Sequence, residues 1–215
     1  MPANGYRPDA VFCHQKEHWG ITFAELPIET FDVATPAAIK FTFQDCHYKD
    51  IVPGQTFAIM EGSHQVGEVK FMIDVLGNLS HAFRIAAAES ASDEETVASL
   101  IAFSEILVPS EYLNLIRKHS EVELMVSGTR TIRIWGASGC IEMNEAYHIQ
   151  KYIPQSLAIG DDEGGNALIY ATGHEGFGVY AVAFNDLEAD EMKYISESLL
   201  SLLGNGKGVQ TLMNL

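Results

Sequence analysis

Short runs in which apolar and polar residues alternate fill the first 88 residues of the chain. Residues 40–43 (KFTF) alternate clearly, and a period of two is typical of a strand with one buried face. Residues that favour turns separate the runs at 53–54 (PG), 61–63 (EGS) and 77–78 (GN), the last of which is typical of a hairpin turn. The pattern predicts a β-rich first half with strands at 10–13, 20–26, 39–43, 56–60, 68–75 and 80–85.

The apolar positions take up a helical spacing after residue 91. Ser92 can cap a helix, Glu95 completes a capping box, and Pro109 suits the first turn of a second helix. A third helix is predicted over 187–203, because its apolar residues form one stripe, acids fill its first turns and Gly204 stands at its end. Strands are predicted at 122–126, 131–135, 149–153, 167–171 and 179–184, with a glycine-containing break at 136–139 and a loose tail at 205–215. This order predicts an α+β fold, an antiparallel sheet with helices packed on one side.

No linker rich in proline, glycine or serine divides the chain, and only residues 86–91 suggest a boundary. We therefore predict two domains. Residues 1–88 form a β-rich region of unknown role, and residues 89–215 form the α+β domain.

The net charge of the chain limits the kinds of molecule that it could bind. The chain has 29 acidic and 13 basic side chains and a formal charge of −16, and residues 89–215 hold 19 of the acids but only 7 of the bases. Binding to nucleic acid needs patches of Lys and Arg, so this balance argues against nucleic acid as a partner. It suits either plain solubility or the attraction of a basic partner.

The cysteines and the apolar runs indicate the compartment. Three scattered cysteines suit a reducing cytoplasm better than a disulfide framework. No run approaches the roughly 18 apolar residues of a membrane helix. The first residues lack the basic and then apolar pattern of a signal peptide. We therefore expect a cytoplasmic protein that does not contact membranes.

Motifs for catalysis and for cofactors are weak. No Gly-x-Ser-x-Gly motif is present, and the segment 204–208 (GNGKG) follows a helix and lacks the Lys-Ser/Thr pair of a phosphate loop. We expect a protein that is not an enzyme and holds no metal or cofactor, although a site within residues 1–88 stays open as an alternative. A zinc site is not favoured, because no pair with ligand spacing occurs among Cys13, His14, His18, Cys46, His47 and His64.

An acidic, glycine-rich turn at 160–166 (GDDEGGN) lies between short apolar runs. Its glycines supply positive φ angles and its asparagine can bond the backbone, so part of the turn is structural. Its acids are either solvated or bind a cationic surface, and their consecutive positions do not suit a calcium loop, which places ligands at alternate positions. The structural residues are Gly164, Gly165 and Asn166, and the acids are Asp161, Asp162 and Glu163.

Four segments in this order resemble the SUKH superfamily, which includes fungal cell-wall-synthesis regulators and bacterial immunity proteins of polymorphic toxin systems. They are 108–116 (VPSEYLNLI), 152–154 (YIP), 160–166 (GDDEGGN) and 178–180 (GVY). The resemblance covers residues 90–210. The chain departs from the family at 119–121 (HSE), where asparagine-glycine is usual, and at 183–185 (AFN), where an acid-histidine pair is usual.

The resemblance implies a non-catalytic bacterial binding protein, an immunity protein that covers the basic active-site surface of a toxin domain. The alternative is a regulatory or scaffold protein with a housekeeping partner. The predicted contact residues are Asp161, Asp162 and Glu163, with Glu142, Glu145 and Glu175 as further candidates.

Overall fold

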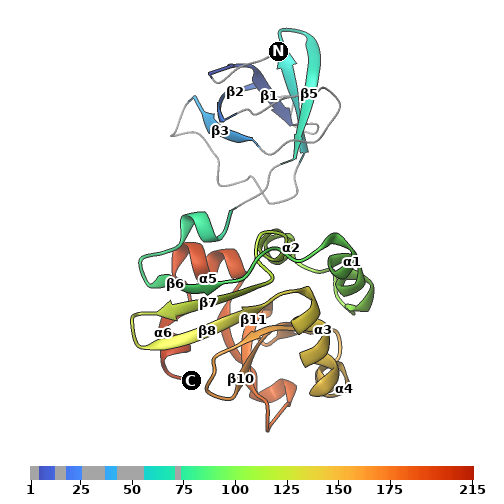
Figure 1. The fold of residues 1–215 in the computed structure, drawn as a ribbon, viewed down its shortest axis with the longest axis vertical. Coiled ribbons are helices and arrows are strands. Elements are labelled where there is room, and N and C mark those ends of the chain that lie inside the picture. The colour runs from blue at the N-terminus through green and yellow to red at the C-terminus, as the bar shows by residue number, and fades with distance from the viewer. Residues whose placement is uncertain (1–4, 13–17, 26–36, 43–55, 71–73) are drawn as a thin grey trace. The chain divides into compact units, whose positions relative to one another are not determined.

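The chain divides into two compact units, Met1–Met72 and Ile73–Leu215 (Figure 1). A computed structural model describes residues 5–12, 18–25, 37–42, 56–70 and 74–215. The units meet at 72/73 and not at the predicted 88/89. The reason is that β6 (Phe83–Ala88) pairs with β7 (Glu121–Val126) and so belongs to the sheet of the second unit.

Unit 1 is a five-stranded antiparallel sheet with the order β3-β2-β1-β4-β5. Side chains of β4 alternate between partly exposed and buried positions, as the sequence pattern predicts. Its buried core consists of Ala10, Ile21, Phe23, Phe57 and Ile59. The strands are β1 (Asp9–Phe12), β2 (His18–Glu25), β3 (Ala38–Phe41), β4 (Thr56–Glu61) and β5 (His64–Lys70).

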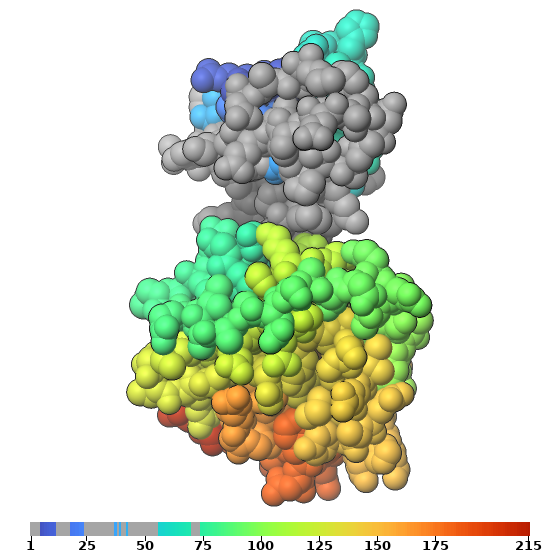
Figure 2. All heavy atoms as spheres, in the orientation of Figure 1, coloured from blue at the N-terminus to red at the C-terminus, as the bar shows by residue number. Residues whose placement is uncertain are grey.

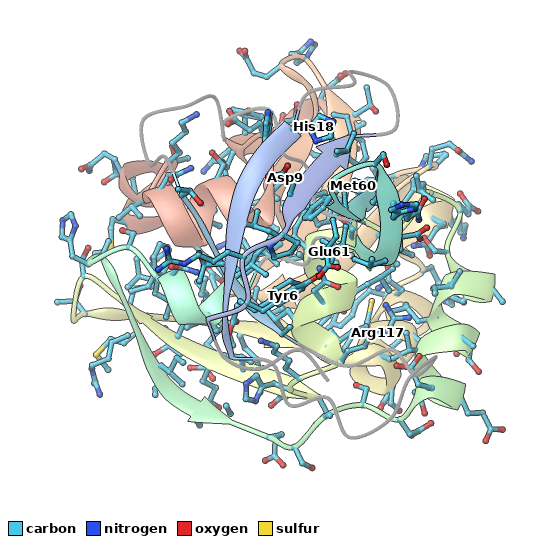
Figure 3. The ribbon with its side chains drawn as sticks, turned by 90° about the horizontal axis from the view of Figure 1, so that it is seen from above. Tyr6, Asp9, His18, Met60, Glu61 and Arg117 are labelled. Atoms are coloured by element: carbon cyan, nitrogen blue, oxygen red, sulfur yellow. The ribbon has the colours of Figure 1, made fainter. Side chains whose placement is uncertain are left out.

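Polar contacts link the strands of unit 1 (Figure 3). The Tyr6 hydroxyl donates to the carboxylate of Glu61, and burial, together with that carboxylate, raises the pKa of Tyr6 to about 12. Nδ1 of His18 lies 3.4 Å from a carboxylate oxygen of Asp9, which sits on the neighbouring strand. Tyr6 therefore connects the segment before β1 to the end of β4.

Unit 2 is built on a seven-stranded antiparallel sheet whose strands follow chain order from β6 to β12. Alternate residues of β7 are buried, whereas every residue of β9 is buried. The centre of the sheet is therefore covered on both faces, and its β6–β7 edge on one. The remaining strands are β8 (Arg130–Trp135), β9 (Leu157–Asp161), β10 (Asn166–Gly173), β11 (Gly176–Ala183) and β12 (Lys193–Ser196).

α-Helices lie in the β6–β7 and β8–β9 connections of unit 2 and at its C-terminal end, which confirms the predicted α+β class. Asp93, rather than Ser92, caps the first helix by accepting a hydrogen bond from the Thr96 amide at 2.8 Å. Among the described residues, no helix has both the length and the apolar character needed to cross a bilayer. The α-helices are α1 (Glu94–Phe103), α2 (Ser110–Ile116), α3 (Ala137–Ala146), α4 (Ile149–Tyr152), α5 (Leu199–Asn205) and α6 (Val209–Met213).

The single helix predicted over 187–203 is wrong. Residues 193–196 form β12, which pairs with β11, and the helix α5 starts only after Ser198, whose hydroxyl accepts from the Ser201 amide at 3.0 Å. The apolar stripe that suggested one helix is shared between an edge strand and a short helix. Pairing with β11 outweighs the local helical spacing of these residues.

The break in the strand pattern at 136–139 is confirmed, because β8 ends at Trp135 and helix α3 follows. Three further predictions for unit 2 are wrong. The expected strand at 149–153 is helix α4, and the expected tail at 205–215 contains helix α6. The predicted hairpin turn at 77–78 lies in a 3-10 helix, Leu76–Asn78.

Figure 2 shows a face of unit 2 formed mainly by residues between β6 and β10, with the C-terminal residues (red) at its margin.

Helix α3 replaces a missing strand beside β9. β8 pairs with β9 only at Arg133 and Ile134 and then leaves the sheet. The amide of Asn144 takes its place, because Nδ2 donates to the Ala158 carbonyl at 2.7 Å and Oδ1 accepts from the Ala158 amide at 3.0 Å. Asn144 is fully buried, and its Oδ1 also accepts from Gln150 at 2.8 Å. One side chain thus satisfies both backbone groups of a strand residue.

Candidate functional site

The acidic turn places its first two carboxylates inside the protein. Asp161 is 4% exposed, and its Oδ2 accepts from the Trp135 indole at 2.8 Å and from Arg133 at 3.0 and 3.2 Å. Its Oδ1 accepts from the backbone amide of Glu163 at 2.9 Å. Both oxygens are therefore occupied by groups of the chain itself.

Asp162 is equally buried but points to the opposite face of the sheet, as consecutive strand residues do. Its Oδ1 accepts from the backbone amides of Gly164 and Asn166, each at 2.8 Å. Its Oδ2 accepts from Asn166 Nδ2 at 2.7 Å and from Arg130 at 3.3 Å. Arg130 also donates to the Leu212 carbonyl at 2.8 Å, so this carboxylate links the turn to α6.

The turn conformation agrees only in part with its prediction. Gly165 has the expected positive φ of 103°, but the second residue with a positive φ is Glu163, at 52°, and not Gly164. The side chain of Asn166 bonds the carboxylate of Asp162 and not the backbone. Asp162 thus shapes the turn as much as its glycines do.

The predicted contact residues do not form one patch. Asp161 and Asp162 are buried and unavailable to a partner, whereas Glu163, Glu142, Glu145 and Glu175 are exposed. Glu163 precedes β10 and Glu175 follows it, and a strand of eight residues spans roughly 25 Å. Glu163 and Glu175 therefore lie at opposite ends of the sheet.

The metal candidates receive little support from the described residues. No group of three or more His, Cys, Asp or Glu side chains in that part of the chain could hold a metal ion. Nδ1 of His18 lies 3.4 Å from Asp9, and His64 is exposed at the start of β5. The other candidates, Cys13, His14, Cys46 and His47, lie outside the described residues.

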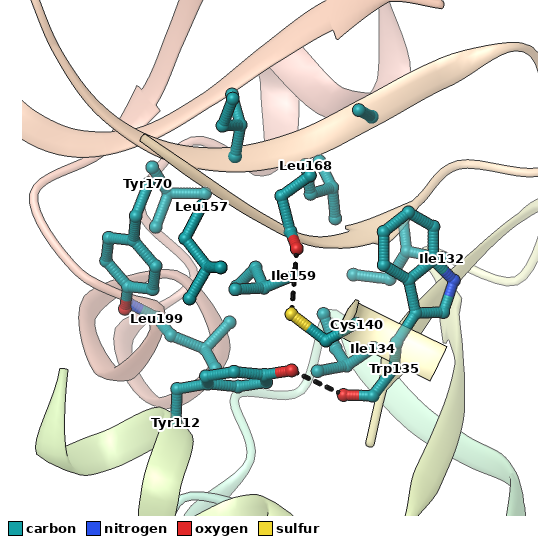
Figure 4. Close-up of a cluster of buried hydrophobic side chains, with 14 of the residues drawn as sticks. Tyr112, Ile132, Ile134, Trp135, Cys140, Leu157, Ile159, Leu168, Tyr170 and Leu199 are labelled. Atoms are coloured by element: carbon teal, nitrogen blue, oxygen red, sulfur yellow. Dashed lines mark hydrogen bonds between the residues drawn. The ribbon is translucent and has the colours of Figure 1, made fainter. Parts of the chain in front are cut away.

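Cys140 is a buried residue of helix α3. It lies in the core between Tyr112 and Ile159, and its thiol donates to the Ala158 carbonyl at 3.1 Å (Figure 4). Burial raises the pKa of this thiol to about 12. The thiolate that nucleophilic chemistry requires is therefore scarce at neutral pH.

This burial predicts that Cys140 resists alkylation. Iodoacetamide at pH 8 should leave the Cys140 peptide unlabelled in the native protein and label it fully in 8 M urea, as peptide mass spectrometry can measure. Labelling of the native protein at the rate of a free thiol would contradict the buried placement.

Unit 2 exposes large apolar side chains, among them Leu107 and Phe177, which the sequence reasoning did not identify. Leu107, in the connection between α1 and α2, is 94% exposed. Phe177, at the start of β11, is 48% exposed, and its ring stacks on that of Tyr170 with centroids 5.7 Å apart. A sequence signal existed for both, since 106–108 (ILV) cannot all point inward from a short connection, and Phe177 stands between two glycines.

Tyr170 joins the sheet to two helices. Its hydroxyl donates to Oε1 of Glu111 in α2 at 2.9 Å and accepts from the Leu199 amide in α5 at 2.9 Å. Burial, and then the charge of Glu111, raises the pKa of Tyr170 well above its usual value of 10. The hydroxyl therefore keeps its proton and fixes the Glu111 carboxylate beside Phe177.

No protein-family model and no curated protein matches this chain. The SUKH resemblance therefore depends on the four sequence segments alone and stays a prediction.

Proposed function

We propose that this chain is a non-catalytic binding protein of SUKH type whose partner is a basic protein domain. In this proposal it acts as an immunity protein, covering the basic active-site surface of a toxin domain. The order of the four motif segments supports the class, and the distribution of charge in unit 2 supports the chemistry of the partner.

The observation that carries the proposal is the surplus of carboxylates on unit 2. Residues 73–215 contain twenty acidic and eight basic side chains. Five of the basic side chains form ion pairs within this unit, each with a different acid. The other fifteen acids of residues 74–215 form no ion pair with a described basic side chain, and each of them is exposed or partly exposed.

Such a surplus acts mainly on the rate of association. Summed charge of one sign attracts an oppositely charged protein over distances longer than a contact and speeds the encounter. The two buried acids play no part in this attraction, because Arg130 and Arg133 pair with them. The contact set that we propose therefore keeps Glu163, Glu142, Glu145 and Glu175 and omits Asp161 and Asp162.

The test measures, by stopped-flow fluorescence, how fast this chain associates with the basic toxin domain encoded beside its gene. The association rate should fall at least tenfold between 20 and 500 mM NaCl, because the screening length shrinks to only a few ångströms at high salt. The dissociation rate should change much less. Co-expression should also restore growth to cells that produce the toxin domain.

Two variants of exposed acids, Glu163→Gln and Glu142→Gln, test the contribution of single charges, because each keeps the shape of the side chain and removes one charge. Each should lower the association rate at low salt. The melting temperature is the folding control and should not change. An association rate that does not depend on salt, or the absence of binding to the neighbouring domain, would contradict the proposal.

A further inference from the structure

Two residues at one end of the unit 2 sheet combine an aromatic and an acidic group. We call this pair the sheet-end surface, and it consists of Phe177 and Glu111. Phe177 lies at the start of β11, and Glu111 lies in the first turn of α2. Both residues contact Tyr170, which joins them.

Phe177 presents an open aromatic face. One side of its ring stacks on Tyr170, with 15° between the ring planes. The side chain of Phe177 is 48% exposed, so part of the ring remains accessible beside this stack.

Glu111 presents one carboxylate oxygen. Its Oε1 accepts from Tyr170, and no described group bonds its Oε2. The side chain is half-buried and has no basic partner among residues 74–215. The surface thus offers an exposed aromatic ring and one carboxylate, which a buried tyrosine holds in place.

This combination fits a guanidinium group. A planar cation gains by stacking on an aromatic face and by pairing with carboxylates, and arginine does both better than lysine. A metal ion does not fit, because the described residues hold no cluster of ligands.

We propose that the sheet-end surface receives an arginine of the basic partner, with its guanidinium on Phe177 and paired with Glu111. This rests on the proposed function and names the contact that fixes the partner after electrostatic encounter. Contacts made in the bound complex act mostly on the dissociation rate, whereas exposed charges elsewhere act on association. Loss of the arginine contact is therefore expected to raise the dissociation rate, whereas loss of exposed charges elsewhere is expected to lower the association rate.

Two variants and one matched control test this contact in the full chain. Phe177→Ala removes the ring, and Glu111→Gln keeps an acceptor for Tyr170 but removes the charge. Each should raise the dissociation rate from the neighbouring toxin domain by about tenfold. The control is Tyr152→Ala. Tyr152 is a similarly exposed aromatic residue, at 50%, whose ring already has Lys151 over it at 5.2 Å. It should leave the rate unchanged.

A second measurement needs no natural partner. Amide NMR spectra of the full chain are titrated with the peptide acetyl-Gly-Leu-Arg-Gly-amide and with its citrulline counterpart, which is neutral but has the same shape. The arginine peptide should shift the amides of Glu111, Phe177 and Gly178, and the citrulline peptide should not. Equal shifts with both peptides, or undiminished shifts in Phe177→Ala, would overturn the inference.

The two proposals can fail separately. If the toxin domain associates in a salt-dependent way while Phe177→Ala and Glu111→Gln dissociate as the unchanged chain does, the arginine contact is wrong and the binding function stands. If the arginine peptide binds at this surface but the toxin domain does not associate, the contact stands and the immunity function is wrong.

Discussion

Replacing Asn144 with leucine is expected to lower the free energy of unfolding of unit 2 by about 1–3 kcal/mol. Leucine fills similar space but offers no polar atom, so the Ala158 amide would be buried without a partner. The Ala158 carbonyl would lose its amide donor and keep the thiol of Cys140, which is a weak donor. A backbone group left unpaired in this way costs about 1–3 kcal/mol.

The measurement is urea unfolding followed by the fluorescence of Trp135, in a Trp19→Phe background so that only unit 2 is observed. Asn185→Leu, at an exposed position after β11, is the matched control and should change stability by no more than about 0.5 kcal/mol. A loss below 1 kcal/mol for Asn144→Leu would show that Asn144 is not required to complete the strand.

The second large effect is expected for Asp162→Ala, at about 3–5 kcal/mol of lost stability. Removing one member of a buried ion pair leaves the other charge without compensation, and Arg130 is only 26% exposed. The amides of Gly164 and Asn166 lose their acceptor as well. The comparison is Glu163→Gln, one residue along, which should leave stability within about 0.5 kcal/mol because its side chain is exposed.

The same urea unfolding assay compares the two variants. Similar stabilities for Asp162→Ala and the unchanged chain would contradict the structural role and return Asp162 to the partner surface. A pronounced loss in Asp162→Ala with none in Glu163→Gln would separate the two neighbours as the structure does, one a residue of the core and the other of the surface.

Predictions from the sequence were correct for strands and helices whose own residues carry a clear pattern. Alternation located β4, β7 and β8 within one or two residues, and Pro109 correctly marked the start of α2. The pattern failed where distant partners decide the conformation. Residues 193–196 become a strand because β11 offers its edge, and nothing in their own spacing reveals this.

Two acids of the turn, Asp161 and Asp162, are buried for a related reason. Three adjacent carboxylates suggest a charged surface, but the burial of two of them depends on Arg130 and Arg133, about thirty positions earlier in the chain. A signal was present in the spacing. Residues three apart in a strand point to opposite faces, as do consecutive residues, so two arginines and two aspartates can pair across one sheet. Only the register of β8 against β9 identifies which pairs form.

The chain-order sheet of unit 2 has a consequence for its synthesis. Every strand from β7 onward pairs with the strand made just before it, so no strand must wait for a distant C-terminal partner. Pairings between neighbours in sequence close short loops and favour rapid folding. We expect the sheet to grow from β6 towards β12 while the chain leaves the ribosome, and the core to close last, when α5 and α6 bury Leu202, Leu203 and Leu212.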